Sequence, residues 1–116
     1  MIPTALVAAS IKPFLLSILA EGESYGYAII QRVKLLTGGK IEWTTSTLYP
    51  VLHSLENRGL LESQWQTSQE GPRRKYYRLT PKGRKALDAE KQQWLDVHRA
   101  LIQLWNPGFA AGLQPA

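Results

Sequence analysis

The last part of this chain carries a helical pattern that is too long for the rest of the molecule to cover. From Pro81 to Trp105 no helix breaker follows Gly83, and apolar residues recur at intervals of seven. Such a helix would be roughly 37 Å long, in a chain of only 116 residues. A heptad-like stripe on a helix of this length leaves an apolar surface that so small a domain cannot cover. The residues of the stripe are Leu87, Trp94, Val97, Leu101 and Leu104.

Trp94 lies in the middle of this stripe. A dimer twofold axis would bring two copies of its indole together, and a gap between them would suit a planar aromatic ligand. Plain packing within the interface is the alternative for Trp94. The other tryptophans, Trp43, Trp65 and Trp105, are interpreted as core or interface residues.

Two helices are expected in the first 40 residues. The first carries apolar residues at intervals of three and four and ends at Gly22. Ser10 is a candidate cap for it, and the residues before Ser10 would either extend the helix or form an arm. The second begins with Ser24 as its cap and ends at Gly38, and Gly26 in its first turn indicates close packing. Their inward-facing residues would be Ile11, Phe14, Leu15, Ile18, Leu19, Ile29, Ile30, Val33 and Leu36.

A third helix is expected after a short extended segment at residues 41–43, which resembles a one-bridge strand. Thr44 or Thr45 would cap this helix, and Gly59 would end it. Its buried stripe consists of Leu48, Leu52 and Leu55. The residues off that stripe, which a partner could contact, are Ser46, Thr47, Tyr49 and His53.

Residues 60–68 and 74–80 both alternate in side-chain character and flank a Gly-Pro turn. Two such runs predict a β-hairpin. Thr80 and Pro81 then supply a cap and a first-turn proline for the long helix. Three helices, a hairpin and a long helix are the elements of a winged helix-turn-helix, in which the third helix enters a DNA groove and the hairpin forms the wing. The predicted fold is therefore mainly α: a winged helix-turn-helix with a β-hairpin wing and a long C-terminal helix.

The charge of the chain is concentrated beside that hairpin. The net charge is +5, from 14 basic and 9 acidic residues, yet residues 71–85 alone hold seven cations and no acid. The remaining 101 residues thus hold 7 cations and 9 acids, a net charge of −2. A solvated surface is the ordinary interpretation of a charge run, but this concentration favours a polyanionic partner. The wing residues expected to contact it are Arg73, Arg74 and Lys75.

Several classes of protein are disfavoured by the sequence. The apolar start is interrupted by Lys12 and Pro13, and the run that follows is far shorter than the roughly 20 residues needed to span a bilayer. The absence of cysteine excludes disulfides and fits the cytoplasm. His53 and His98 stand alone, and neither a metal-binding spacing nor a GxSxG motif is present. We therefore expect no membrane association, no cofactor or metal, and no enzymatic activity.

Three stretches resemble the PadR family of bacterial transcriptional regulators: SYGYAIIQRV (24–33), STLYPVLHSLENRGLL (46–61) and GPRRKYYRLTPKGRKAL (71–87). The resemblance implies a homodimeric winged-helix repressor that binds a twofold-symmetric operator through its third helix and wing. It also implies that the C-terminal helix makes most of the dimer contact, and the dimer contacts expected there are Leu87, Trp94, Val97, Leu101 and Leu104. It assigns the recognition-helix role to Ser46, Thr47, Tyr49 and His53. Ser46 departs from the glycine common in the family, and Ser54 from a common basic residue.

The resulting prediction divides the chain into a DNA-binding domain (1–80), a dimerisation helix (81–105) and a flexible tail (106–116). Its partners would be double-stranded DNA, a second copy of the chain and a small aromatic effector. Two alternatives stay open. In the first, the chain is a winged-helix interaction module whose hairpin binds an acidic protein, without sequence-specific DNA binding. In an RNA-binding alternative, Tyr76 and Tyr77 would stack on bases of a single strand.

Overall fold

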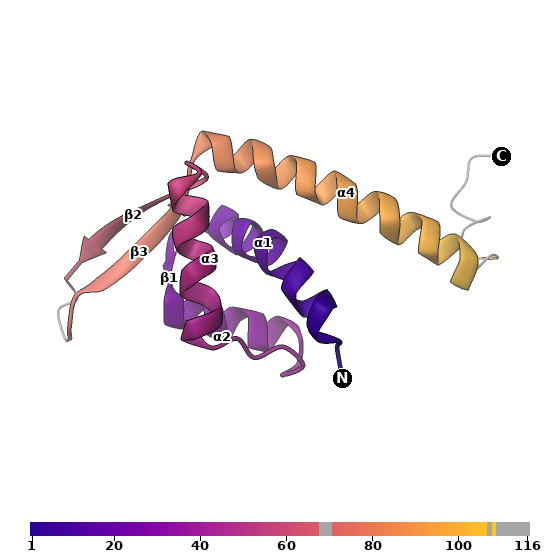
Figure 1. Cartoon of the computed structure of the whole chain (residues 1–116), viewed down its shortest axis with the longest axis horizontal. Coiled ribbons are helices and arrows are strands. Elements are labelled where there is room, and N and C mark those ends of the chain that lie inside the picture. Colours follow the sequence, from indigo (N-terminus) through magenta and orange to yellow (C-terminus); the bar gives the residue numbers. More distant parts are fainter. Residues whose placement is uncertain (68–70, 107, 109–116) are drawn as a thin grey trace.

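A computed structural model of the chain describes residues 1–67, 71–106 and 108. Within these residues four helices surround one small antiparallel sheet, in which β3 lies between β1 and β2 (Figure 1). The predicted mainly helical fold with a hairpin wing is confirmed. The elements are α1 (Thr4–Glu21), β1 (Ser24–Tyr25), α2 (Gly26–Leu36), α3 (Thr45–Asn57), β2 (Leu61–Gln66), β3 (Arg74–Leu79) and α4 (Pro81–Trp105).

The core lies where the three short helices and the base of the hairpin meet. Most of the predicted inward-facing residues are buried there, although Leu36 is half exposed. Tyr77 from the wing and Leu87 from α4 join this core. The fully buried side chains are Leu15, Leu16, Ile29, Val33, Leu48, Leu52, Leu55, Leu61, Tyr77 and Leu87.

Helix α1 is the core helix that the sequence predicts. By length and composition it could cross a membrane, since its 18 residues have a mean hydropathy of 1.5. It nevertheless packs against α2, α4 and β3. Because one face of α1 fills the centre of the domain, its apolar character is explained by core packing. The α1 side chains in the core are Ile11, Leu15, Leu16, Ile18 and Leu19.

Ser10 is not the cap of α1, and of the two alternatives for the residues before it, extension of the helix is the one observed. The helix begins at Thr4, and the Pro3 carbonyl accepts the N–H groups of Leu6 and Val7. Ser10 lies inside the helix, where its hydroxyl donates to the Val7 carbonyl at 2.7 Å. Serine can form this bond within a helix as well as act as a cap. Pro13 therefore occupies the helix interior.

Two further sequence predictions are wrong near β1. Ser24 does not cap α2, because Ser24 and Tyr25 pair with Tyr77 and Tyr76 as the third strand of the sheet. Residues 41–43 form no strand; Ile41 and Trp43 instead bury their side chains in the core. In both cases tertiary pairing and burial decided the conformation, which local sequence preferences do not encode.

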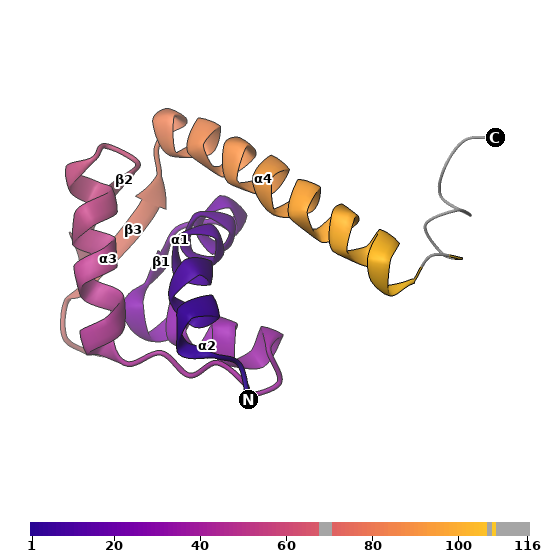
Figure 2. The same cartoon turned by 45° about the vertical axis from the view of Figure 1, so that its right-hand side comes forward.

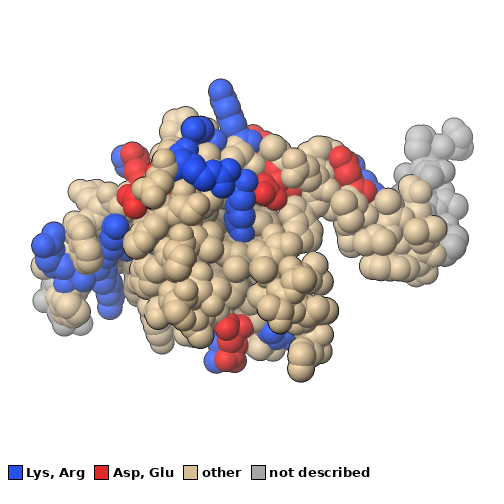
Figure 3. Space-filling view, in the orientation of Figure 1, with Lys and Arg blue, Asp and Glu red and all other residues tan. Residues whose placement is uncertain are grey.

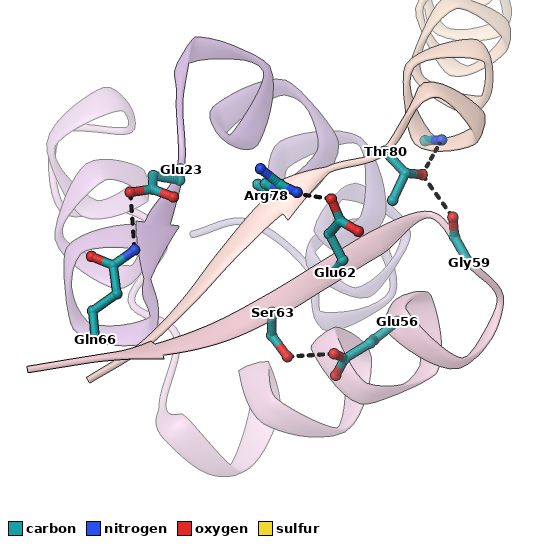
Figure 4. A network of polar contacts seen from close by, with 9 residues as sticks. Glu23, Glu56, Gly59, Glu62, Ser63, Gln66, Arg78 and Thr80 are labelled. Carbon is teal, nitrogen blue, oxygen red and sulfur yellow. Dashed lines mark hydrogen bonds and ion pairs between the residues drawn. The ribbon is translucent and has the colours of Figure 1, made fainter. Parts of the chain in front are cut away.

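The predicted threonine caps of α3 and α4 are confirmed. Thr44 accepts a hydrogen bond from the Thr47 amide at 3.2 Å, and Thr80 accepts one from the Gly83 amide at 3.0 Å. Thr80 also donates to the Gly59 carbonyl at 2.7 Å (Figure 4). Since Gly59 follows α3, this contact ties the end of α3 to the start of α4.

Helix α4 leaves the domain after its first turns. Its first half packs along α1, where Lys12 and Glu90 form an ion pair at 3.4 Å. Its second half extends beyond the other elements in both views (Figures 1 and 2). There α4 leaves apolar side chains exposed, as the heptad pattern predicts. They are Trp94, Leu95, Val97, Leu101, Leu104 and Trp105.

Leu87 requires a correction. It is among the dimer contacts expected from the sequence, but its side chain is 1% exposed because it packs into the core of its own chain. With Gly83 also buried, the first two turns of α4 belong to the winged-helix domain. The predicted tail at 106–116 lies outside the described residues, apart from Asn106 and Gly108. Residues 68–70, which precede Gly71 in the predicted turn of the hairpin, also lie outside them.

Candidate nucleic-acid interface

The four candidate residues of α3 are all exposed. They occur there because Leu48, Leu52 and Leu55 hold the opposite face of α3 in the core. Ser46 and Thr47 lie at the N-terminal end, where both hydroxyls hydrogen-bond the Thr44 hydroxyl, at 2.9 and 3.1 Å. The N-terminal end of α3 thus presents a cluster of hydroxyl groups, which can donate to or accept from base edges.

Tyr49 and His53 follow one turn apart along the same helix. Their rings lie 6.4 Å apart between centroids, and the Tyr49 side chain is 37% exposed. The Tyr49 hydroxyl rests against Gly26 at the start of α2, where an added Cβ would lie only 2.5 Å from the hydroxyl oxygen. The expected close packing at Gly26 is therefore confirmed, and its partner is a candidate DNA-reading residue.

A groove of about 540 Å³ separates α3 from the wing. We call it the interface groove. It brings together Tyr49 and His53 of α3 with all three predicted wing cations, whereas Ser46 and Thr47 lie outside its lining. Its lining consists of Tyr25, Gly26, Tyr27, Tyr49, His53, Trp65, Arg73, Arg74, Lys75 and Tyr77.

Two of the wing cations are available to a ligand. The guanidinium of Arg73 lies 5.4 Å from the Trp65 ring, and that of Arg74 lies 4.6 Å from the Tyr25 ring. Neither arginine forms an ion pair with any acid in the described part of the chain. Aromatic rings orient a guanidinium without neutralising its charge. Arg73 and Arg74 can therefore bind phosphate groups.

Lys75 differs from its neighbours. Its ammonium group pairs with Glu56 of α3 at 3.8 Å and lies 5.5 Å from the Tyr77 ring. Glu56 also accepts a hydrogen bond from Ser63 of β2 (Figure 4). One carboxylate therefore links α3 to both strands of the wing. Lys75 consequently holds the wing in place as well as adding charge to the interface groove.

The hairpin separates the seven cations of residues 71–85 into different sites. Arg78 pairs with Glu62 across the strands, and Lys82 donates to the Arg58 carbonyl at the opposite end of the hairpin. Figure 3 shows cations at the wing end of the molecule and a second group near the start of α4. Strand β3, which has six residues and is roughly 17 Å long, runs from the first group to the second. The charge run therefore contributes only part of its cations to the interface groove.

The single-stranded RNA interpretation is contradicted by Tyr77. Its side chain is 0% exposed, so it cannot stack on a base. Burial, together with the smaller effect of the nearby Glu56 charge, raises the pKa of Tyr77 to about 12. Tyr76 packs edge-on against Tyr25, with 5.2 Å between ring centroids. Packing of the hairpin, the ordinary interpretation of these tyrosines, is confirmed.

Tyr27 and Trp65 line the interface groove, although the sequence did not identify either as a DNA-contacting residue. Trp65 was expected to be a core or interface residue, and the side chains of Tyr27 and Trp65 are 66% and 55% exposed. Trp43, in contrast, is buried as expected. The sequence feature that could have identified Trp65 is its position near the hairpin turn. It is on the same strand face as Leu61 but far from the core.

Comparison with known proteins agrees with this geometry. The profile of the "Transcriptional regulator PadR-like family" matches residues 15–89, which are 75 of the 116 residues. The chain belongs to the PadR-like family. It is therefore a DNA-binding transcriptional regulator, as the three matching stretches of its sequence imply.

Individual PadR relatives cover most of the chain. "Transcriptional regulator Rv3488" of Mycobacterium tuberculosis is 33% identical over 94 residues, covering 81% of this chain and 84% of that protein. A transcriptional regulator from Clostridium thermocellum has a TM-score of 0.79 at 28% identity, covering 89% and 97% of the two chains. A PadR family regulator from Clostridium difficile R20291 has a TM-score of 0.71 at 30% identity, covering 84% and 99%.

Proposed function

We propose that this PadR-family chain is a homodimeric repressor that binds a pseudo-palindromic operator in the cytoplasm. The observation that carries the proposal is the interface groove. It places the exposed face of α3 beside Arg73 and Arg74, which have no acidic partner within the described residues. A helix that fits the major groove and adjacent cations that fit phosphates are the two requirements of a winged-helix DNA reader.

The two halves of this surface have different roles in the proposal. Arg73 and Arg74 supply electrostatic affinity by displacing counterions from phosphates, which carries little sequence information. Ser46, Thr47 and Tyr49, together with His53, supply sequence choice at base edges. Hydroxyl groups serve either hydrogen-bonding role there, and threonine methyls suit thymine methyls.

Dimerisation is proposed to occur through the second half of α4. Trp94, Val97 and Leu101 expose apolar surface there, and Leu104 extends it toward the end of the helix. A second copy would cover this surface and fix the separation of two recognition helices. Leu87 takes no part, because the core of its own chain covers it.

A titration of promoter duplex at several salt concentrations tests the DNA-binding part. The wild-type affinity should fall steeply with salt, and the double variant Arg73→Ala/Arg74→Ala should bind more weakly with a flatter slope. The matched control is Arg84→Ala/Lys85→Ala, which removes the same charge from exposed positions of α4 that do not line the interface groove. Equal slopes for the two double variants would contradict the proposal.

The same titration addresses the protein-interaction alternative. An operator reader prefers one duplex over scrambled duplex, single strand and RNA. A module that meets an acidic protein has no such preference among nucleic acids. Loss of the gene should raise transcription from the bound promoter if the protein is a repressor, and lower it if the protein is an activator.

We also propose that a planar aromatic effector releases the operator by binding near Trp94. Trp94 is 39% exposed, and its indole N–H donates to Glu90 at 3.2 Å. It lines an apolar cavity of about 420 Å³ with Phe14 and Ile18 of α1. Flat aromatic compounds should quench tryptophan fluorescence and weaken operator binding, and Trp94→Leu should abolish both effects. An unchanged response in that variant would exclude this site.

A further inference from the structure

The inner face of the hairpin passes from the core to the interface groove. Leu61 pairs with Leu79 at its base, Ser63 with Tyr77 in the middle, and Trp65 with Lys75 nearer the tip. Side chains two residues apart on a strand point to the same side. Trp65 is therefore on the same face as the buried Leu61, but it lies beyond the edge of the core and is 55% exposed.

Trp65 is also held in place by a cation. The guanidinium of Arg73 lies 5.4 Å from its ring centroid, so one side of the indole is backed by a positive charge. This contact limits the orientations of both side chains and leaves the rest of the indole to the groove. Within the described residues, every charged side chain that lines the interface groove is a cation. A polyanion can consequently approach the indole without repulsion.

A single exposed apolar side chain needs no special explanation on an ordinary surface. Trp65, however, shares a groove with the face of α3 that reads DNA and with the two available arginines. A tryptophan buries 150–250 Å² when a partner covers it, as a rough general range. The surfaces that adjoin the phosphates of a duplex are deoxyribose rings and base edges, both of which offer apolar contact.

We propose that Trp65 contacts the operator itself, packing its indole against the sugar and base-edge surface next to the phosphates bound by Arg73 and Arg74. This inference rests on the proposed DNA binding. The contact adds an apolar contribution to the operator affinity, to which the wing otherwise contributes through its charges. Counterion release does not supply this contribution, so it does not depend on salt concentration.

Substitution of Trp65 gives a defined signature. Trp65→Ala should weaken operator binding by about fivefold to a hundredfold, the range that a lost aromatic contact to nucleic acid implies. The slope of log affinity against log salt should stay at the wild-type value. Trp65→Phe should retain most of the affinity because it keeps an aromatic face. Thermal unfolding of both variants checks that the exposed position leaves the fold intact.

The competing explanation is that Trp65 only positions Arg73. In that case Trp65→Ala would lower the salt slope by about one, as Arg73→Ala does. The double variant Trp65→Ala/Arg73→Ala would then bind no more weakly than Arg73→Ala alone. A double-mutant cycle with these three variants decides between the two roles. Direct contact requires an additional loss in the double variant, and its absence would overturn the inference.

Fluorescence provides a second measurement that does not depend on affinity. The difference between wild-type and Trp65→Phe spectra isolates the Trp65 signal from those of the other three tryptophans. Saturating operator duplex should shield this signal from acrylamide. If the wild-type protein bound duplex but the Trp65 signal were not shielded, the inference about Trp65 would be overturned, while the proposed DNA binding would stand. If the wild-type protein bound no duplex at all, the proposed function would fail, and this inference would fail with it.

Discussion

At the scale of the residue, Tyr77 shows what burial costs in this fold. Its ring fills the centre of the core, but its hydroxyl has no hydrogen-bond partner among the described residues. An unpartnered buried hydroxyl destabilises a protein. The same burial raises the pKa of Tyr77 to about 12, because the ionised form is excluded from a low-dielectric site.

Tyr77→Phe should therefore be neutral or slightly stabilising at pH 7. Between pH 10 and 12 the unfolded chain loses the Tyr77 proton while the folded chain keeps it, so the free energy of unfolding falls as pH rises. For a shift of this size the loss is on the order of 2 kcal/mol, and the phenylalanine variant should lack it. Urea denaturation at pH 7, 10 and 11.5 measures the difference, and parallel curves for both proteins would contradict the prediction.

Two glycines should respond differently to alanine. A Cβ at Gly83 would overlap the carbonyl oxygen of Leu60, which belongs to the backbone and cannot easily move. It would also lie 2.8 Å from the Leu79 side chain. Gly83→Ala should therefore cost about 2–3 kcal/mol of stability. A Cβ at Gly26 would meet only the end of the Tyr49 side chain, which can move.

Gly26→Ala is thus the matched control for Gly83→Ala. It should change stability by less than about 1 kcal/mol, yet weaken operator binding because it displaces Tyr49. Thermal unfolding and duplex titration of both variants separate the two effects. The prediction fails if Gly26→Ala unfolds as readily as Gly83→Ala.

At the scale of the element, the two halves of the single helix α4 have different surroundings. Its first turns bury Gly83 and Leu87 in the domain, and its second half presents an apolar face that the described part of the chain leaves largely exposed. The sequence stripe is continuous through both parts. Only packing against α1 and the hairpin separates the residues that stabilise the fold from those available to a partner.

Leu101→Asp should yield a monomer, since it places a charge on the exposed apolar face of α4. Gln103→Asp adds the same charge on the opposite side of the helix and should leave the dimer intact. Sedimentation velocity distinguishes the two, and operator binding should weaken markedly for Leu101→Asp only. A dimeric Leu101→Asp protein would show that the interface lies elsewhere.

At the scale of the whole molecule, the wing and the free part of α4 lie at opposite ends (Figure 1). The surfaces proposed for DNA binding and for dimerisation are therefore separate. If two copies pair through α4, the separation of their recognition helices is fixed, and the operator half-sites must match it. Twofold-symmetric readers place half-sites one helical turn, about 10–10.5 base pairs, or a multiple of it apart.

Operator spacing should consequently decide affinity. Insertion of about 5 base pairs between the half-sites turns one of them to the other side of the duplex, and binding should weaken by at least about tenfold. Insertion of a full turn should restore part of the affinity if the DNA or the dimer can adapt. Fluorescence anisotropy with the three duplexes tests this, and equal affinities would indicate independently binding monomers.

The sequence alone determined the features that depend on local chemistry. Thr44 and Thr80 cap helices because a threonine hydroxyl accepts an amide hydrogen bond wherever a helix starts. The heptad stripe, the alternating hairpin and the cluster of cations likewise follow from spacing. These features, with the three stretches that resemble the PadR family, sufficed to predict the fold. They also pointed to five residues of the interface groove, which are Tyr49, His53, Arg73, Arg74 and Lys75, but not to Trp65.

The tertiary structure decided what depends on distant partners. Ser24 became a strand residue because Tyr77 was beside it, Leu87 became core because α1 covered it, and Lys75 was paired because Glu56 lay within reach. Trp65 was left exposed because the hairpin extends beyond α3. Each outcome depends on burial and pairing between residues far apart in the chain, so a local sequence pattern cannot predict it.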